Sequence, residues 1–561
     1  MRPLPFLLLT GALAAGSLHA QLVESIEVRV TNVDVVVTDR QGHPVAGLTK
    51  DDFELYENRK PQPITNFYEV RPPAASEASV AIAPATPNAT PAVAAAPEPP
   101  QDLRRRRVIF FIDEYSANPI RRNQVLRSMI AQLDALMKPG DEAMLVSWNR
   151  SMHIIEPFTN DREHMRKALA RLEERGGGGP NLDAGKEILK SRVTSLVDEV
   201  RMKRKTAAQA LGEAFDYVRA YSMELYAIQQ NLAQSMGVAL TTLAGVDGKK
   251  VMVFAGEHMP AHPGAEMFGW AEQQFQSVGL MSTGAAEREG NKISLTLAFE
   301  SVAKQANAAG VTMYMLDSAD PLRGVLPSSE SNEVADPVTS FVDFTNTAQT
   351  FQAIAQLTGG VALTQSSNFD AALQTVARDL EAYYSLGYRP ADEKREGDRN
   401  ITVKVKNPAY RVRSRRTYVS KSGEQQTSER VVANIFAATS KNDIELRLDP
   451  GQPVGSGFHK WRVPVRVTIP SVFTLLPDGD QLAGGFTVFV AVGDDDGAMS
   501  SVTKRSQSLK IPAASEAAFR RRPITFDMQV EVNKGEHVLS VGVVDQLTNA
   551  TGFARTKIWG R

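Results

Sequence analysis

The sequence predicts an α/β protein whose central domain is a doubly wound, mostly parallel sheet. Continuous apolar runs at residues 108–112, 142–148 and 251–255 are typical of strands buried on both faces of such a sheet. Helix-forming segments separate these runs, which is the pattern of βαβ units. Alternating apolar and polar residues on both sides of this region predict an N-terminal β unit and a C-terminal β-sandwich.

The central domain is expected over residues 104–420. Residues 183–245 contain no proline and carry apolar residues at helical spacing, so we expect a helical insertion of two or three long helices there. Residues 318–343 are rich in Ser, Asp and Pro and predict a long loop. The other elements alternate, with strands expected at 108–113, 142–148, 152–157, 249–256, 311–316 and 383–388, and helices at 118–137, 161–174, 295–309, 351–357 and 369–381.

The first 20 residues are typical of a secretory signal peptide. Arg2 precedes a short apolar stretch, and the small residue Ala20 precedes the expected cleavage point. No second apolar run of about 18 residues follows, so we expect an exported mature chain, periplasmic or extracellular, without a transmembrane segment. Residues 21–71 predict an N-terminal β unit too small to be very stable alone. Residues 72–103 predict a Pro/Ala-rich linker.

The rest of the chain is expected to be mostly β. Residues 400–419 predict a hairpin that closes the central domain, residues 421–430 a polar linker, and residues 431–561 the C-terminal β-sandwich. Four arginines at residues 104–107 directly precede the first buried strand. We expect them to be a solvated flank of the preceding linker rather than a site for an acidic partner.

Composition excludes several functional classes. Of the 561 residues, 63 are Lys or Arg and 64 are Asp or Glu, so the formal net charge is -1. Nucleic-acid binders normally show a basic excess, so we expect no nucleic-acid partner. The chain has no cysteine, which excludes disulfides, Cys-ligated zinc, Fe–S clusters, thiol nucleophiles and a lipoprotein anchor. Eight histidines leave His/carboxylate metal sites open.

Ordered motifs carry a resemblance to a known family. Residues 108–113 (VIFFID), 140–146 (GDEAMLV), 248–254 (GKKVMVF) and 358–362 (TGGVA) resemble strands of a von Willebrand factor A (vWA) domain. Over roughly residues 26–420 the chain resembles the VWFA-related domain proteins of the acidobacterial type, which carry motifs like VDVVVTD at 33–39, LTKDDF at 48–53, YYSLGYRP at 383–390 and RNITVKV at 399–405. The resemblance implies a ligand-binding module, not an enzyme.

The resemblance also implies a metal-ion-dependent adhesion site, here in degenerate form. The family uses Asp-x-Ser-x-Ser after the first strand, a Thr from a second loop and an Asp after the fourth strand, since hard cations prefer oxygen ligands. Asp113 matches the first position, but EYSA at 114–117 replaces both serines and moves Ser116 out of register by one residue. The loop at 176–182 has no Thr, and Glu257 is the nearest carboxylate after the fourth strand. Asp113, Ser116 and Glu257 would be the ligands if Mg²⁺ or Ca²⁺ binds; otherwise no cofactor is expected.

A second constellation follows the fourth strand. His258 and His262 are four residues apart, a spacing that suits zinc on one helical face, and Glu257 lies beside them. Pro260 and Pro263 interrupt any helix there, so a polar loop is the expected structure.

We therefore expect an exported, non-catalytic protein that binds a protein partner. The carboxyl ends of parallel strands are where ligands sit in doubly wound sheets, so the loops at 113–118, 176–183 and 257–263 form the predicted contact rim. Two alternatives stay open, namely divalent-cation-dependent adhesion through a rebuilt site and a metal-dependent hydrolase. The candidate rim residues are Asp113, Ser116, Asn118, Asn181, Glu257, His258 and His262.

Overall fold

The computed structural model describes residues 31–70, 105–175, 180–282, 284–319, 337–364, 368–390, 397–437, 443–457, 459–494 and 497–561. In the helices that begin at residues 180 and 337, side chains are described from residues 184 and 339. The expected signal peptide (1–20) and linker (72–103) lie outside the described residues and stay predictions. The chain divides into two compact units, residues 29–237 with 247–420 and residues 238–246 with 421–561, and each is described by itself.

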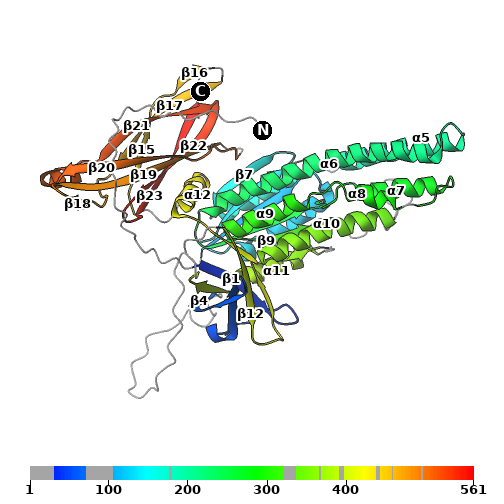
Figure 1. Ribbon diagram of the computed structural model, residues 1–561, viewed down its shortest axis with the longest axis horizontal. Coiled ribbons are helices and arrows are strands. Elements are labelled where there is room, and N and C mark those ends of the chain that lie inside the picture. Colours follow the sequence, from blue (N-terminus) through cyan, green and yellow to red (C-terminus); the bar gives the residue numbers. More distant parts are fainter. Residues whose placement is uncertain are drawn as a thin grey trace, which may run out of the picture. The chain divides into compact units, whose positions relative to one another are not determined.

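A six-stranded sheet forms the centre of the first unit (Figure 1). All neighbouring strands are parallel except β7, which runs antiparallel to β6 at one edge. This confirms the prediction of a doubly wound, mostly parallel, vWA-like sheet. In order across the sheet the strands are β10 (Ala362–Leu363), β9 (Val311–Asp317), β8 (Lys249–Gly256), β5 (Arg106–Asp113), β6 (Glu142–Trp148) and β7 (Met152–Thr159).

Helices cover both faces of this sheet, because its central strands are apolar on both sides. On one face, Phe110 and its neighbours pack against α2 (Pro119–Ala131), α3 (Leu133–Leu136), α4 (Arg162–Glu173) and α11 (Phe369–Glu381). On the other face, the ring of Phe254 packs edge-on against Phe351 of α10 (Pro337–Thr358) at 5.7 Å. Helix α9 (Thr296–Ala309) contacts both α10 and β9. The loop predicted for residues 318–343 is wrong at its end, since α10 already begins at Pro337.

The amino ends of the central strands carry buried ion pairs. Arg106 donates from Nε to both carboxylate oxygens of Asp141, at 2.9 and 2.8 Å. Arg107 donates to Glu142 at 2.7 Å and to the carbonyl of Asp247 at 2.8 Å. The prediction that residues 104–107 are a solvated flank is therefore wrong for Arg106 and Arg107, which are buried because carboxylates of the neighbouring segment neutralise them.

The helical insertion is part of a larger arm. Two long helices, α5 (Pro180–Arg201) and α6 (Ala207–Ala244), fill the predicted range. They share a hydrophobic core with α7 (Ala265–Gln276) and α8 (Ala285–Gly290), which follow β8 and were not predicted from the sequence. In Figure 1 these helices run beside one another, and α10 also packs against α7. Two segments that are separate along the chain thus build one helical arm, which consists of α5, α6, α7 and α8.

The N-terminal β unit is completed by strands from residues 383–420, at the C-terminal end of the central domain in the sequence. Strands β1 (Thr31–Thr38) and β4 (Ile64–Val70) pair antiparallel with β11 (Tyr383–Tyr388), which the sequence had assigned to the parallel sheet. A second sheet has the order β14-β12-β2-β3, and the two sheets share one apolar core. The remaining elements are the 3₁₀ turn η1 (Lys50–Asp52) and strands β2 (Phe53–Glu57), β3 (Lys60–Gln62), β12 (Gly397–Val405), β13 (Arg411–Ser414) and β14 (Thr417–Ser420).

The predicted closing hairpin at 400–419 forms only in part. Strand β12 pairs with β14 over residues 397–400, whereas its later residues pair with β2. The returning segment is split, because β13 crosses to the other sheet and pairs with β1. Local alternation predicted these extended segments and the local pairing of β12 with β14, but not the pairings with β1 and β2, which lie more than 300 residues away in the chain.

The C-terminal unit contains two antiparallel sheets around a common core, as predicted for the β-sandwich. Along β17, Val463, Val465 and Val467 are buried, while the alternating residues Arg462, Pro464 and Arg466 are exposed. The linker predicted at 421–430 is wrong: helix α12 spans Gly423–Phe436, capped by Ser422 and burying Val431. The strands are β15 (Arg447–Pro450), β16 (Val454–Gly457), β17 (Lys460–Ile469), β18 (Leu476–Asp478), β19 (Gln481–Asp494), β20 (Thr503–Pro512), β21 (Ile524–Asn533), β22 (Gly535–Asp545) and β23 (Thr551–Gly560).

Candidate functional site

The carboxyl edge of the parallel sheet gathers the polar residues that follow β5, β8 and β9. These three strands are neighbours in register, so Asp113, Gly256 and Asp317 end side by side. Gly256 permits the close approach, because a Cβ there would lie 3.0 Å from the Cβ of Asp113 and 2.8 Å from the ring of Phe254. Asp317 was not among the residues predicted for this edge, although it directly follows a buried apolar run.

Asp113 is completely buried and its hydrogen bonds come from its own loop. Oδ1 accepts the backbone N–H groups of Tyr115 at 2.9 Å and Ser116 at 3.1 Å. Oδ2 accepts the hydroxyl of Ser116. Burial raises the pKa of Asp113 to about 6, although these hydrogen bonds favour the charged form. The structure thus brings two of the predicted cation ligands, Asp113 and Ser116, together, but they are hydrogen-bonded to each other.

Aromatic packing fills the first position where the family has a serine. The ring of Tyr115 meets that of Trp148 edge-on at 5.8 Å, and the guanidinium of Arg150 lies 5.7 Å from its centre. Trp148 in turn donates from Nε1 to Asn231 of α6 at 3.1 Å. Ala117, at the second serine position, is also buried. The loop after β5 is therefore part of the packed interior, and Ser116 is the one serine or threonine in it.

Glu257 and Asn118 fasten the start of α2. Glu257 accepts the backbone N–H of Asn118 at 2.7 Å, and the Asn118 side chain accepts the N–H of Ile120 at 2.9 Å. A carboxylate near a helix N-terminus is also favoured by the helix dipole. Asn118 itself is exposed, and so is Ile120, with 66% of its surface accessible.

His258 and His262, which the hydrolase alternative would use together with Glu257, have different partners. His258 Nδ1 lies 3.5 Å from Asp343 Oδ1 of α10, whereas His262 Nδ1 lies 3.3 Å from the carbonyl oxygen of Ile293. Asn346 of α10 holds the backbone of His262 from both sides, at 3.2 and 2.8 Å. The segment is a loop, as Pro260 and Pro263 predicted, and it does not aim the histidines at one point with Glu257.

The second predicted rim loop is only partly described. Residues 176–179 lie outside the described residues, as does the side chain of Asn181, so its place in the rim stays a prediction. Helix α5 begins at Pro180, which shortens the expected loop at 176–183. Within the described ranges, no group of three or more His, Asp or Glu side chains could hold a metal ion.

The residues at this edge do not fit the cation that the fold family implies. A hard cation needs several oxygen ligands with open coordination. Both oxygens of Asp113 accept hydrogen bonds from its own loop, and Glu257 accepts the backbone N–H of Asn118. Tyr115 and Ala117 replace the two serines whose hydroxyls would be cation ligands in the family. We therefore derive no chemistry from a metal at Asp113, Ser116 and Glu257.

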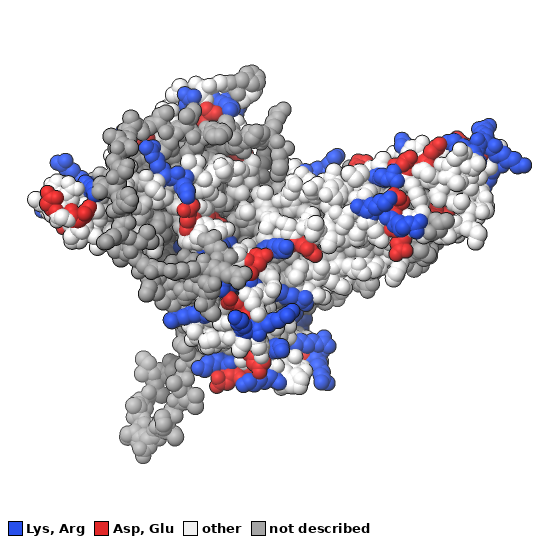
Figure 2. Space-filling view, viewed as in Figure 1, with Lys and Arg blue, Asp and Glu red and all other residues white. Residues whose placement is uncertain are grey.

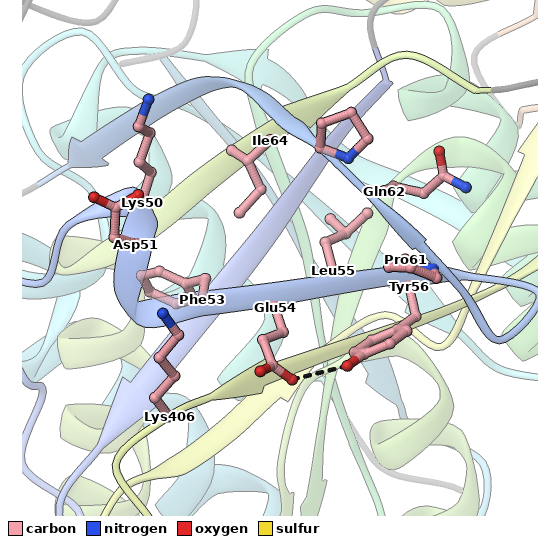
Figure 3. Close-up of a pocket in the computed structure, with 11 residues that line it drawn as sticks. Lys50, Asp51, Phe53, Glu54, Leu55, Tyr56, Pro61, Gln62, Ile64 and Lys406 are labelled. Carbon is pink, nitrogen blue, oxygen red and sulfur yellow. Dashed lines mark hydrogen bonds between the residues drawn. The ribbon is translucent and has the colours of Figure 1, made fainter.

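A separate pocket of about 460 Å³ lies in the N-terminal β region (Figure 3). Its lining includes the charged residues Lys50, Asp51 and Lys406 and the apolar residues Phe53 and Ile64. It was not predicted from the sequence. Its lining mixes both signs of charge, with the Tyr56 hydroxyl already donating to Glu54 at 2.9 Å, so it favours no single class of ligand.

Comparisons with known proteins found distant similarity to several solved structures. No family model and no curated protein matches the chain. Among solved structures, an aerotolerance-related membrane protein from Bacteroides fragilis is similar at 10% identity over 49% of this chain and 98% of that chain, with a TM-score of 0.22. A von Willebrand factor type A protein from Catenulispora acidiphila gives 8% identity, 81% and 65% coverage and a TM-score of 0.21.

A pilus adhesin, SpaC, from Lactobacillus rhamnosus GG is similar at 10% identity over 80% of this chain and 56% of that chain, with a TM-score of 0.24. TM-scores this low carry no argument about fold or function. The vWA-like assignment rests on the order and direction of the strands in the six-stranded sheet.

Proposed function

We propose that this protein is an exported, non-catalytic member of the acidobacterial type of VWFA-related proteins. In this proposal it binds a partner protein with the carboxyl edge of its sheet and needs no metal. The observation that carries the proposal is the hydrogen bonding in the loop after β5. There, both carboxylate oxygens of Asp113 accept hydrogen bonds from Tyr115 and Ser116. An edge of this kind keeps the position of a vWA binding surface while lacking the family's cation ligands.

Exposed side chains near this edge support a protein partner. Ile120, in the first turn of α2, and Phe341, near the start of α10, are 66% and 68% exposed. Arg121 ties α2 to the end of β9 by donating to the carbonyl oxygen of Ser318 at 3.1 Å, which fixes Ile120 relative to the sheet. Apolar side chains on a rigid frame beside polar neighbours are typical of protein contacts.

Charge distribution argues against a polyanionic ligand. On the face shown in Figure 2, Lys and Arg residues are interspersed with Asp and Glu along the arm and the β region. A nucleic-acid or heparin surface would gather one sign. No helix among the described residues is both long and apolar enough to span a bilayer.

Site-specific photo-crosslinking in the cells that produce the protein tests this proposal. A photoreactive residue at Ile120 is expected to give a discrete adduct with one partner. The matched control is Lys304, which is exposed on α9 toward the opposite edge of the sheet. Equal adducts from both positions would refute the assignment to the carboxyl edge. An adduct from Ile120 that disappears with EDTA would instead support cation-dependent adhesion.

A further inference from the structure

Glu266 is a buried carboxylate at the base of the arm. It stands in the first turn of α7, its side chain is 2% exposed, and its Oε2 has no hydrogen-bond partner among the residues that the structure describes. Oε1 lies 3.8 Å from Nζ of Lys186 on α5. The turn before α7 is fixed by Gly264, at φ +73°, where an added Cβ would come within 3.2 Å of the Cβ of Ser222 on α6. Glu266 therefore sits where α5, α6 and α7 converge.

Charges of opposite sign face Glu266 from two other helices. Lys186 of α5 favours its ionised form, whereas Asp343 of α10 disfavours it. Asp343 is itself 3.5 Å from His258 in the loop after β8. On α8, which carries Glu287 and Glu289, Glu289 is paired with Arg219 of α6 at 3.1 Å. Burial is the largest effect, and it raises the pKa of Glu266 from 4.5 to about 7.

We propose that Glu266 is a proton-operated switch that sets how tightly α7 packs against α5 and α10. A neutral carboxyl is tolerated in this interior, whereas an ionised one lacks enough hydrogen bonds to replace water and is repelled by Asp343. Through α10 and His258 the switch connects the arm with the loop after β8. The inference does not depend on the partner proposed for the carboxyl edge.

The direction of the pH effect follows from proton linkage. The pKa of Glu266 is higher in the folded arm than the ordinary value of 4.5, so the folded arm binds the proton more tightly than the open arm does. The resulting stabilisation is fully present below pH 4.5 and is lost as the pH rises through about 7. Between pH 6 and pH 8 the open population of α7 should rise about tenfold.

Hydrogen–deuterium exchange of the peptide covering α7, corrected for intrinsic exchange rates, tests the switch. Wild-type protection is expected to fall about tenfold between pH 6 and pH 8, and Glu266→Gln should abolish this fall. The matched control is Glu272→Gln, because Glu272 is also buried on α7 but accepts the hydroxyl of Ser282 at 3.1 Å. This control should keep the wild-type profile.

Two further variants test the electrostatic cause and do not require that Glu266→Gln fold normally. Lys186→Met should move the midpoint of the pH profile upward, and Asp343→Asn should move it downward, since they remove charges of opposite sign. A wild-type protein whose protection does not fall, a Glu266→Gln variant that keeps the fall, or midpoints that move in the same direction would each overturn the proposal.

Discussion

The two ends of strand β5 both carry buried ionisable side chains, but these side chains have different kinds of partner. At the amino end, Arg106 and Arg107 are buried against Asp141 and Glu142, so each charge has a partner of opposite sign. At the carboxyl end, Asp113 is equally buried but has no cation within ion-pair distance among the described side chains, and it accepts hydrogen bonds from its own loop.

This difference distinguishes an edge with paired charges from an edge whose buried carboxylates have raised pKa values. Paired charges are stable over a wide pH range and cost most when one partner is removed. A buried carboxylate that has only hydrogen bonds has a raised pKa, and burial likewise raises the pKa of Asp317 at the end of β9 to about 6. Perturbed acids gathered in one place are typical of functional regions, although they are also found in purely structural networks.

Removing a charge at the amino end should have the largest effect. Arg106→Met leaves Asp141 buried without its guanidinium, so we expect a loss of about 3–5 kcal/mol in the free energy of unfolding. Chemical denaturation of the first unit measures this loss. The control is Arg127→Met, since Arg127 is an exposed residue paired with Glu173, and there the loss should stay below about 1 kcal/mol. Equal losses would show that the Arg106 pair is not what holds this edge.

Crowding between the ends of β5 and β8 should have the next largest effect. Gly256→Ala places a Cβ against Asp113 and Phe254, and we expect it to cost about 1–3 kcal/mol. Gly269→Ala on α7 is the control, because an added Cβ there meets nothing within 4 Å and alanine favours a helix. Thermal unfolding that ranks the two variants in the reverse order would contradict the close approach at the carboxyl edge.

The pH dependence of the carboxyl end should be smaller. The pKa of Asp113 is about 6 in the folded protein and 3.8 ordinarily, so its stabilising contribution is present below pH 3.8 and is lost as the pH rises through 6. Between pH 5 and pH 8 the wild type should lose about 1.5 kcal/mol more than Asp113→Asn. Denaturation curves at the two pH values measure the difference, and parallel losses would mean that Asp113 is ionised in the folded protein throughout this range.

Local patterns predicted the parallel sheet well because each central strand is a continuous apolar run. They could not predict that β11 pairs with β1 and β4, since antiparallel partners more than 300 residues apart leave no local signal. Only the α5 and α6 part of the arm was predicted, because the sequences of these two helices carry apolar residues at helical spacing. That α7 and α8 share their hydrophobic core is visible only in the folded structure.

The positions of several candidate rim residues were predicted in outline, while their role in binding stays a prediction. Asp113, Ser116, Asn118 and Glu257 were correctly placed near the ends of β5 and β8, and the structure links them in pairs. The sequence could not show that His258 and His262 have different partners, because that depends on α10 and on the loop before α9. Glu266 was missed, since a glutamate in the first turn of an amphipathic helix is normally a solvated residue.

Isothermal titration of the mature chain with Mg²⁺, Mn²⁺ and Ca²⁺ tests most directly whether the carboxyl edge is closed by its own hydrogen bonds. Because Asp113 and Ser116 bond to each other and Glu257 holds Asn118, no saturable isotherm is expected for any of the three ions. A saturable isotherm that Asp113→Ala abolishes would contradict this account and would establish a rebuilt cation site at the end of β5.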